Sequence, residues 1–289
     1  MGPYQVNTTF PVGWRERRIS AAGVGITAFE AGSAAPDART LVLVHGLGHW
    51  TQAAWDALVP LLDGDLRIVA FDLPGFGRSE KPKARYDTAF FATVVTQALD
   101  ALAPGAFALC GHSLGGYVAA TYAAAHPRRV ERLILIAPAG FLRSPHFVFA
   151  LLGTQLARWL FLSGPGRRLV EQTLDRSVVD PTSIGPQIRA AAFALAQDPD
   201  VRRAFAAVYT GAIADFADTP RIHARLRSWT GRTLIIWGRQ DVYIPVGALA
   251  GARAVYPQAQ VVICERSGHL AMVEEAERVA AAINEFLTA

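Results

Sequence analysis

The feature that most limits the fold of this chain is an alternation of short apolar runs with amphipathic helical patterns. Strands buried on both faces read as continuous apolar runs, and parallel strands need long crossovers between them, usually helices. We therefore predict an α/β fold with a mostly parallel sheet covered by helices on both faces. The expected strands span residues 17–20, 25–30, 40–45, 66–71, 106–111, 130–136, 233–237 and 260–264, and the expected helices span residues 51–62, 88–102, 114–125, 246–255 and 272–287.

The alternation is interrupted once. Residues 141–228 are mostly helical in pattern, with Pro and Gly between the helical segments, and the strand–helix order resumes beyond them. This arrangement predicts one core domain formed by residues 1–140 and 229–289, with residues 141–228 inserted as a helical cap. A length of 289 residues suits one large domain with such an insertion.

Composition excludes several classes of protein. Hydrophobic residues make up 52% of the chain and charged residues 18%, so intrinsic disorder is excluded. The net charge of +4 is not gathered into a basic block or an aromatic-interleaved basic stripe, so no nucleic-acid partner is expected. Cys110 and Cys264 each end an apolar run and are expected to be buried strand residues. No secretory signal pattern is visible, so we expect a cytoplasmic protein.

One strand pattern runs into Gly111-His112-Ser113-Leu114-Gly115 and then into a helix of small residues. The pattern G-x-S-x-G between a strand and a helix is typical of a nucleophile elbow. The serine of such a turn takes a strained backbone conformation, and only flanking glycines let the neighbouring backbone pass closely enough. The N-terminus of the following helix favours negative charge beside the serine. We therefore predict that Ser113 is a nucleophile.

A serine nucleophile needs a base and an orienting carboxylate, which follow this elbow in the order Ser, Asp or Glu, His. Asp241 stands just after the strand at 233–237, and His269 follows the strand at 260–264. The carboxyl ends of parallel strands meet at one edge of a sheet, so the three side chains can converge there. We predict Ser113, Asp241 and His269 as a catalytic triad.

A glycine-flanked turn follows the first buried strand and can aim a backbone N–H at a developing oxyanion. We expect the N–H groups of Leu47 and Leu114 to form this oxyanion hole. His49 and Trp50 are expected to line the substrate pocket, whereas His45 is interpreted as a structural turn residue. No set of His, Asp, Glu or Cys has metal-ligand spacing and no nucleotide-binding glycine loop is present, so neither a metal nor a cofactor is expected.

Together these motifs resemble the α/β-hydrolase fold superfamily, and the likeness covers most of the chain. The matching segments are residues 45–48, 72–79, 111–116, 237–241 and 267–269. The resemblance implies an eight-stranded, mostly parallel sheet whose second strand is antiparallel, with a helical cap inserted after the sixth strand. It also implies Ser113 as nucleophile, Asp241 as acid and His269 as base.

The sequence departs from some branches of this superfamily. Its serine nucleophile argues against haloalkane dehalogenases and epoxide hydrolases, which use an aspartate. Carbon–carbon bond hydrolases of ring-fission products usually carry Gly-Pro-Gly after the oxyanion turn and a Trp directly after the catalytic His. This chain has His49-Trp50 and Leu270 at those places, and its elbow is more similar to serine esterases, lipases and cofactor-free perhydrolases.

Residues 146–163 form one of the most hydrophobic stretches of the chain. Roughly 18 residues are the lower limit for a bilayer span, and a central Arg158 costs about 2.5–3.5 kcal/mol on insertion. We therefore expect a lid helix instead of a membrane span. Its apolar side, which includes Trp159, is expected to line an acyl pocket or to contact lipid at a membrane surface.

The sequence thus predicts a serine hydrolase that cleaves carboxylic esters of small apolar acyl substrates through an acyl-enzyme. Three alternatives stay open. A carbon–carbon bond hydrolase would use the same triad, and a perhydrolase or acyltransferase would pass the acyl group to another acceptor. A ligand-binding module of the same fold would bind without turnover.

Overall fold

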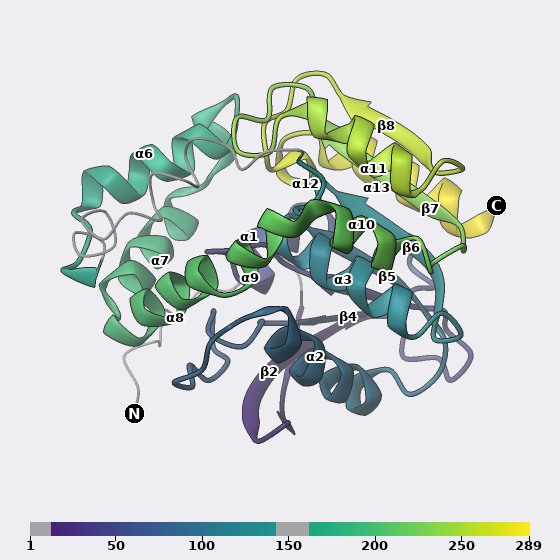
Figure 1. Cartoon of the computed structure of the whole chain (residues 1–289), viewed down its shortest axis with the longest axis horizontal. Helices are drawn as coiled ribbons and strands as arrows, with labels where there is room; N and C mark the ends of the chain where they lie inside the picture. The colour runs from purple at the N-terminus through teal and green to yellow at the C-terminus, as the bar shows by residue number, and fades with distance from the viewer. Residues whose placement is uncertain (1–12, 143–161) are drawn as a thin grey trace.

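A single eight-stranded sheet forms the centre of the molecule, in a computed structural model that describes residues 13–142 and 162–289 (Figure 1). The strand order is β1-β2-β4-β3-β5-β6-β7-β8. β2 pairs antiparallel with β1 and β4, and the other neighbouring pairs are parallel. The predicted sheet with its antiparallel second strand is confirmed. The strands are β1 (Arg15–Ala21), β2 (Val24–Gly32), β3 (Thr40–Val44), β4 (Arg67–Phe71), β5 (Phe107–His112), β6 (Val130–Ile136), β7 (Thr233–Gly238) and β8 (Gln260–Cys264).

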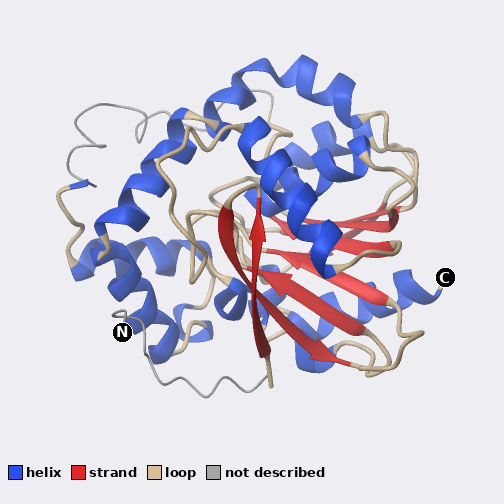
Figure 2. Cartoon of the chain, turned by 90° about the horizontal axis from the view of Figure 1, so that it is seen from below, coloured by secondary structure: helices blue, strands red, loops and turns tan. Residues whose placement is uncertain are grey.

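Helices cover both faces of this sheet (Figure 2). Along β3, Val42 and Val44 belong to one buried cluster, whereas Leu41 and Leu43 belong to the other. The alternation follows from the two-residue period of a strand, and it explains why the run has no polar face. One face is covered by α2 (Thr88–Leu102), α3 (Leu114–Ala125) and α11 (Leu249–Val255), and the other by α1 (Thr51–Trp55), α12 (Ala271–Glu274) and α13 (Ala276–Thr288).

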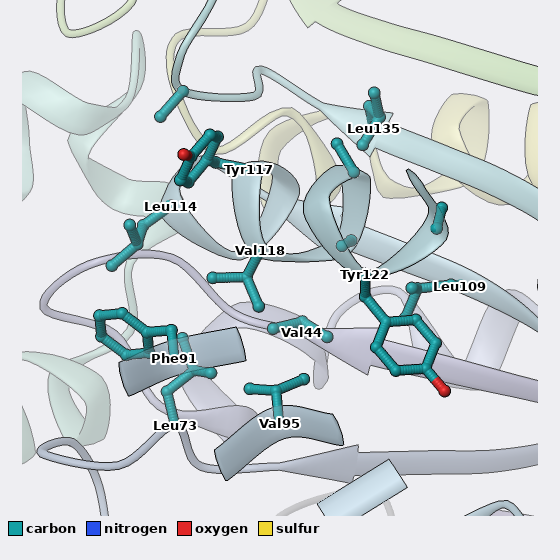
Figure 3. Close-up of a cluster of buried hydrophobic side chains, with 14 of the residues drawn as sticks. Val44, Leu73, Phe91, Val95, Leu109, Leu114, Tyr117, Val118, Tyr122 and Leu135 are labelled. Atoms are coloured by element: carbon teal, nitrogen blue, oxygen red, sulfur yellow. The ribbon is translucent and has the colours of Figure 1, made fainter. Parts of the chain in front are cut away.

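Helix α3 is buried along almost its whole length, because it packs on β5 and β6 and also contacts α2 and α10. Figure 3 shows Val118 and Tyr122 of α3 facing Val95 of α2 and Val44 of β3. A helix that is apolar all round needs such packing on several sides. The close fit fixes the N-terminal end of α3, where Ser113 stands.

The described helices between β6 and β7 follow the sixth strand, as the resemblance implies. They are α6 (Arg167–Ser177), α7 (Pro186–Gln197), α8 (Pro199–Thr210), α9 (Ala212–Asp215) and α10 (Thr219–Leu226). In Figure 1, α6, α7 and α8 lie to one side of the sheet, while α10 returns to pack on α3. The division into a core domain and a cap stays a prediction.

Trp159 and nearly all of the hydrophobic segment 146–163 lie outside the described residues. Among the residues that are described, no helix is both long enough and apolar enough to cross a membrane. The cytoplasmic location stays a prediction. Cys110 and Cys264 are buried free thiols, as expected.

Two predicted helices are divided in the structure. The helix expected at 51–62 ends at Trp55, and a 3-10 turn at Val59–Leu61 follows, where Pro60 has no N–H for a helical hydrogen bond. The helix expected at 272–287 is broken at Glu275, whose backbone has φ −122° and ψ 49°. A further 3-10 turn, Val246–Ala248, opens the segment that continues as α11.

Candidate active site

Ser113 stands at the tip of a tight turn between β5 and α3, with φ 55° and ψ −119°. This conformation is strained for a residue with a side chain. A Cβ on Gly111 would lie 2.3 Å from Gly115 O, and a Cβ on Gly115 would lie 2.3 Å from Val44 O. Glycine is therefore required at both positions, and the predicted nucleophile elbow has the backbone that its sequence pattern indicates.

Asp241 and His269 are joined directly, because His269 Nδ1 lies 2.7 Å from Asp241 Oδ2. A carboxylate only accepts, so Nδ1 carries the proton and Nε2 of the neutral ring is free to accept one. Asp241 Oδ1 accepts from the backbone N–H groups of Tyr243 and Ile244, at 2.8 and 2.9 Å. Both members of the pair are buried, so the carboxylate holds the imidazole in one orientation.

The residue before the predicted nucleophile ties the elbow to the loop of His269. His112 Nε2 donates to the carbonyl oxygen of His269 at 3.0 Å, and the two rings lie 4.6 Å apart between centroids. The contact brings His112, the neighbour of Ser113 in the chain, against His269 at one edge of the sheet. Burial, reinforced by His269 and His49, holds the pKa of His112 well below its usual range. Sequence reasoning missed this role, since His112 occupies a variable position of the motif.

The turn after β3 lies against Ser113. A Cβ on Gly46 would be 2.9 Å from Ser113 Cβ and 2.8 Å from His112 Nδ1, so the main chain passes the serine at close range. In the described part of the chain, the N–H groups of Leu47 and Leu114 donate to no carbonyl, which leaves them available to an oxyanion. Leu47 follows Gly46 in this turn and Leu114 follows Ser113, and their role as oxyanion donors stays a prediction.

His45 holds this turn in place, as the sequence indicates. Its Nδ1 donates to Gly46 O at 2.8 Å, and its Nε2 accepts from Leu73 N at 2.9 Å. Both ring nitrogens are thus occupied within a fully buried side chain. His45 is a structural residue of the turn.

The three predicted pocket residues differ in outcome. The ring of His49 lies 5.8 Å from that of His112, so His49 belongs to the group of side chains around the elbow. Burial, and to a smaller extent the nearby His269, lowers the pKa of His49 to about 3. Trp50 is buried at the start of α1, and within the described residues no ring contact joins it to these histidines. Trp159 lies outside the described residues.

Two further features describe the surroundings. Phe205 of α8 lies over the turn after β3, 3.2 Å from where a Cβ on Gly48 would be. A separate pocket lies between α2, α3 and α10, and its lining includes Phe91, Tyr117 and Tyr122, which Figure 3 labels, but neither Asp241 nor His269. In residues 13–142 and 162–289 no group of His, Cys, Asp and Glu side chains could hold a metal ion.

Comparison with known proteins agrees with this fold. A family model described as the alpha/beta hydrolase fold matches residues 39–164. The chain is 28% identical over 275 residues to a 2-hydroxymuconate semialdehyde hydrolase of Pseudomonas sp. strain CF600, covering 94% of this chain and 93% of the relative.

Solved structures match over nearly the full length. A bacterial membrane phospholipase A is 28% identical with a TM-score of 0.76, and the match covers 96% of this chain and 86% of that one. The Cfl2 protein of Burkholderia cenocepacia is 26% identical with a TM-score of 0.83, and the match covers 95% and 96% of the two chains. The chain has the α/β-hydrolase fold, and it is an enzyme of the hydrolase type.

Proposed function

We propose that this enzyme hydrolyses carboxylic esters with uncharged, apolar acyl groups through a covalent acyl-enzyme. The observation that carries the proposal is the buried Asp241–His269 pair, with its 2.7 Å contact, beside a serine held at φ 55°. A serine hydroxyl is a weak nucleophile unless such a base removes its proton.

In the proposed reaction, Ser113 Oγ attacks the ester carbonyl carbon while His269 Nε2 takes the hydroxyl proton. Asp241 stabilises the resulting imidazolium. The N–H groups of Leu47 and Leu114 bind the negative oxygen of the tetrahedral intermediate. The C–O bond then breaks, and the leaving alkoxide receives the proton from His269. Water, deprotonated by the same base, releases the acid and restores Ser113.

The charges around the elbow support an uncharged acyl group. Burial and the nearby His269 lower the pKa of both His49 and His112, so both rings are neutral near pH 7. The two neutral rings give a carboxylate on the acyl group no charge partner among these histidines, and an unpaired buried carboxylate is costly. The helices between β6 and β7 are proposed to act as a cap, because Phe205 of α8 already covers the turn at Gly48.

A second candidate is hydrolysis of a carbon–carbon bond. It is favoured by the 2-hydroxymuconate semialdehyde hydrolase that is similar over 94% of this chain. The same Ser113, Asp241 and His269 would serve, but the bond broken would be carbon–carbon and the carbon leaving group would take the proton. Leu270, where such hydrolases usually carry Trp, and the neutral rings of His49 and His112 argue for the ester.

The deciding experiment compares wild type with Ser113→Ala on p-nitrophenyl esters from acetate to decanoate and on 2-hydroxymuconate semialdehyde. We expect Ser113-dependent ester hydrolysis that is fastest at medium chain length. Turnover of the semialdehyde with little ester activity would establish the second candidate instead. If folded wild-type protein turned over neither substrate, both candidates would be wrong and a ligand-binding role would replace them.

A further inference from the structure

The backbone of His269 is held from two sides. Its carbonyl oxygen accepts from His112 of the elbow, at 3.0 Å. Its N–H donates to Ser177 O at the end of α6, at 2.8 Å, and the N–H of Leu270 donates to the same oxygen at 3.2 Å. The position of this histidine therefore depends on the insertion as well as on the core.

The contact between the two segments is close. A Cβ on Gly268 would lie 2.8 Å from Ser177 O and 3.1 Å from the Cα of Val178. The segment 177–180, which begins at the last residue of α6, thus lies directly on the loop that carries His269. Tyr243 makes a similar link, because its hydroxyl donates to Thr173 O of α6 at 2.8 Å. Helix α6 is in this way fastened to the loop of Asp241 and to the loop of His269.

One carboxylate joins the segment to the loop. Glu274 Oε1 accepts from the N–H groups of Val179 and Asp180, at 2.6 and 3.0 Å. Its other oxygen, Oε2, accepts from the N–H of Gly268 at 2.7 Å. Hydrogen bonds from N–H groups to a carboxylate are stronger than those between neutral groups. Glu274 is the side chain through which residues 177–180 and residues 267–270 become one unit.

We propose that Glu274 is a positioning residue, which fixes His269 relative to Ser113 by clamping the segment 177–180 of the insertion onto the His269 loop. The inference rests on the proposed role of His269 as the base. Without the carboxylate, three backbone N–H groups lose their acceptor and the two segments are free to separate. A misplacement of about 1 Å in a reacting group costs on the order of 100-fold in rate.

The test measures kcat per reactive serine in three variants. Diethyl p-nitrophenyl phosphate forms a stable covalent adduct with an activated serine, and the p-nitrophenolate released in its burst counts the reactive sites. We expect Glu274→Ala to lower kcat about 10- to 100-fold per titrated site, with a smaller change in KM. Glu274→Gln keeps one acceptor oxygen, so its kcat is expected to lie between that of wild type and that of Glu274→Ala. Glu277→Ala removes the same charge from an exposed site on α13 and is expected to match wild type.

The outcomes separate the two proposals. If wild type is not labelled at Ser113, or Ser113→Ala retains turnover, the proposed function is wrong. If wild type reacts while Glu274→Ala and Glu274→Gln keep the wild-type kcat per titrated site, Glu274 is merely structural and the inference is overturned. Should Glu274→Ala fail to fold, the near-isosteric Glu274→Gln decides by its kcat alone.

Discussion

Gly46 has no side chain, and this allows the turn after β3 to lie against Ser113. A Cβ there would come within 2.9 Å of Ser113 Cβ and 2.8 Å of His112 Nδ1, so the turn or these side chains would have to move. We expect Gly46→Ala to displace the N–H of Leu47. Loss of one oxyanion donor costs about 10²- to 10³-fold in kcat, so kcat should fall by a similar factor while the far-ultraviolet circular dichroism stays that of wild type.

Gly64→Ala is the matched control, because a Cβ at Gly64 meets no atom within 4 Å. Its kcat is expected to equal that of wild type. Full activity in Gly46→Ala would show that the turn tolerates a methyl group and does not supply an oxyanion donor.

The two histidines beside the elbow should not titrate in the range where enzymes of this type are assayed. Burial lowers the pKa of His49 to about 3, and burial together with His269 keeps that of His112 well below its usual range. Both rings are therefore neutral from about pH 5 to 8. We expect kcat/KM to fall on the acid side with the slope of one ionisation, and His49→Asn to leave its midpoint unchanged. A slope of two, or a midpoint moved by His49→Asn, would contradict this assignment.

Among the elements, α1 carries an unusual carboxyl group at its C-terminal end. Asp56 Oδ1 accepts from Trp14 Nε1 at 2.7 Å, and burial raises the pKa of Asp56 from 3.8 to about 6. The folded protein thus holds this proton more tightly than the unfolded chain does. The stabilisation is complete below about pH 4 and is lost as the pH rises through 6.

Asp56→Asn removes this titration and keeps an oxygen for Trp14. At pH 8 we expect the variant to be more stable than wild type by on the order of 1–2 kcal/mol, after allowance for partial solvent screening. At pH 5 the difference should shrink. Urea unfolding at the two pH values measures both quantities, and an equal difference at both would rule out a raised pKa.

The sequence predicted the strands more accurately than the helices, for physical reasons. The central strands β3, β4, β5 and β7 are buried apolar runs, and polar or glycine residues stand at their C-terminal ends. Helix ends depended on local detail that periodicity does not contain, such as Pro60 after α1 and the break at Glu275. The carboxylate of Glu275 turns back to Arg266 N and Ser267 Oγ, which is a contact no helical pattern indicates.

At the scale of the whole molecule, topology explains which parts of the site could be predicted. Ser113, Asp241 and His269 each follow a parallel strand, so the order of the sheet alone brings them to one edge. The bonds from Ser177 and Glu274 could not be predicted in this way, because they join the insertion to the core across about 90 residues. Contacts between a backbone carbonyl and a distant loop leave no pattern in the sequence.

The net charge of +4 and the local surroundings of Ser113 favour opposite substrates. The overall charge attracts anions, but charges more than about 8 Å apart are largely screened at physiological salt. Burying a carboxylate beside the neutral rings of His49 and His112 costs several kcal/mol. We therefore expect the cost of burying the carboxylate to outweigh the attraction by the overall charge. In 0.15 M salt, kcat/KM for p-nitrophenyl butyrate should be at least about 10-fold above that for p-nitrophenyl hemisuccinate. If the anionic ester is the better substrate and loses its advantage as salt is added, the long-range field governs selectivity and the proposed uncharged acyl site is wrong.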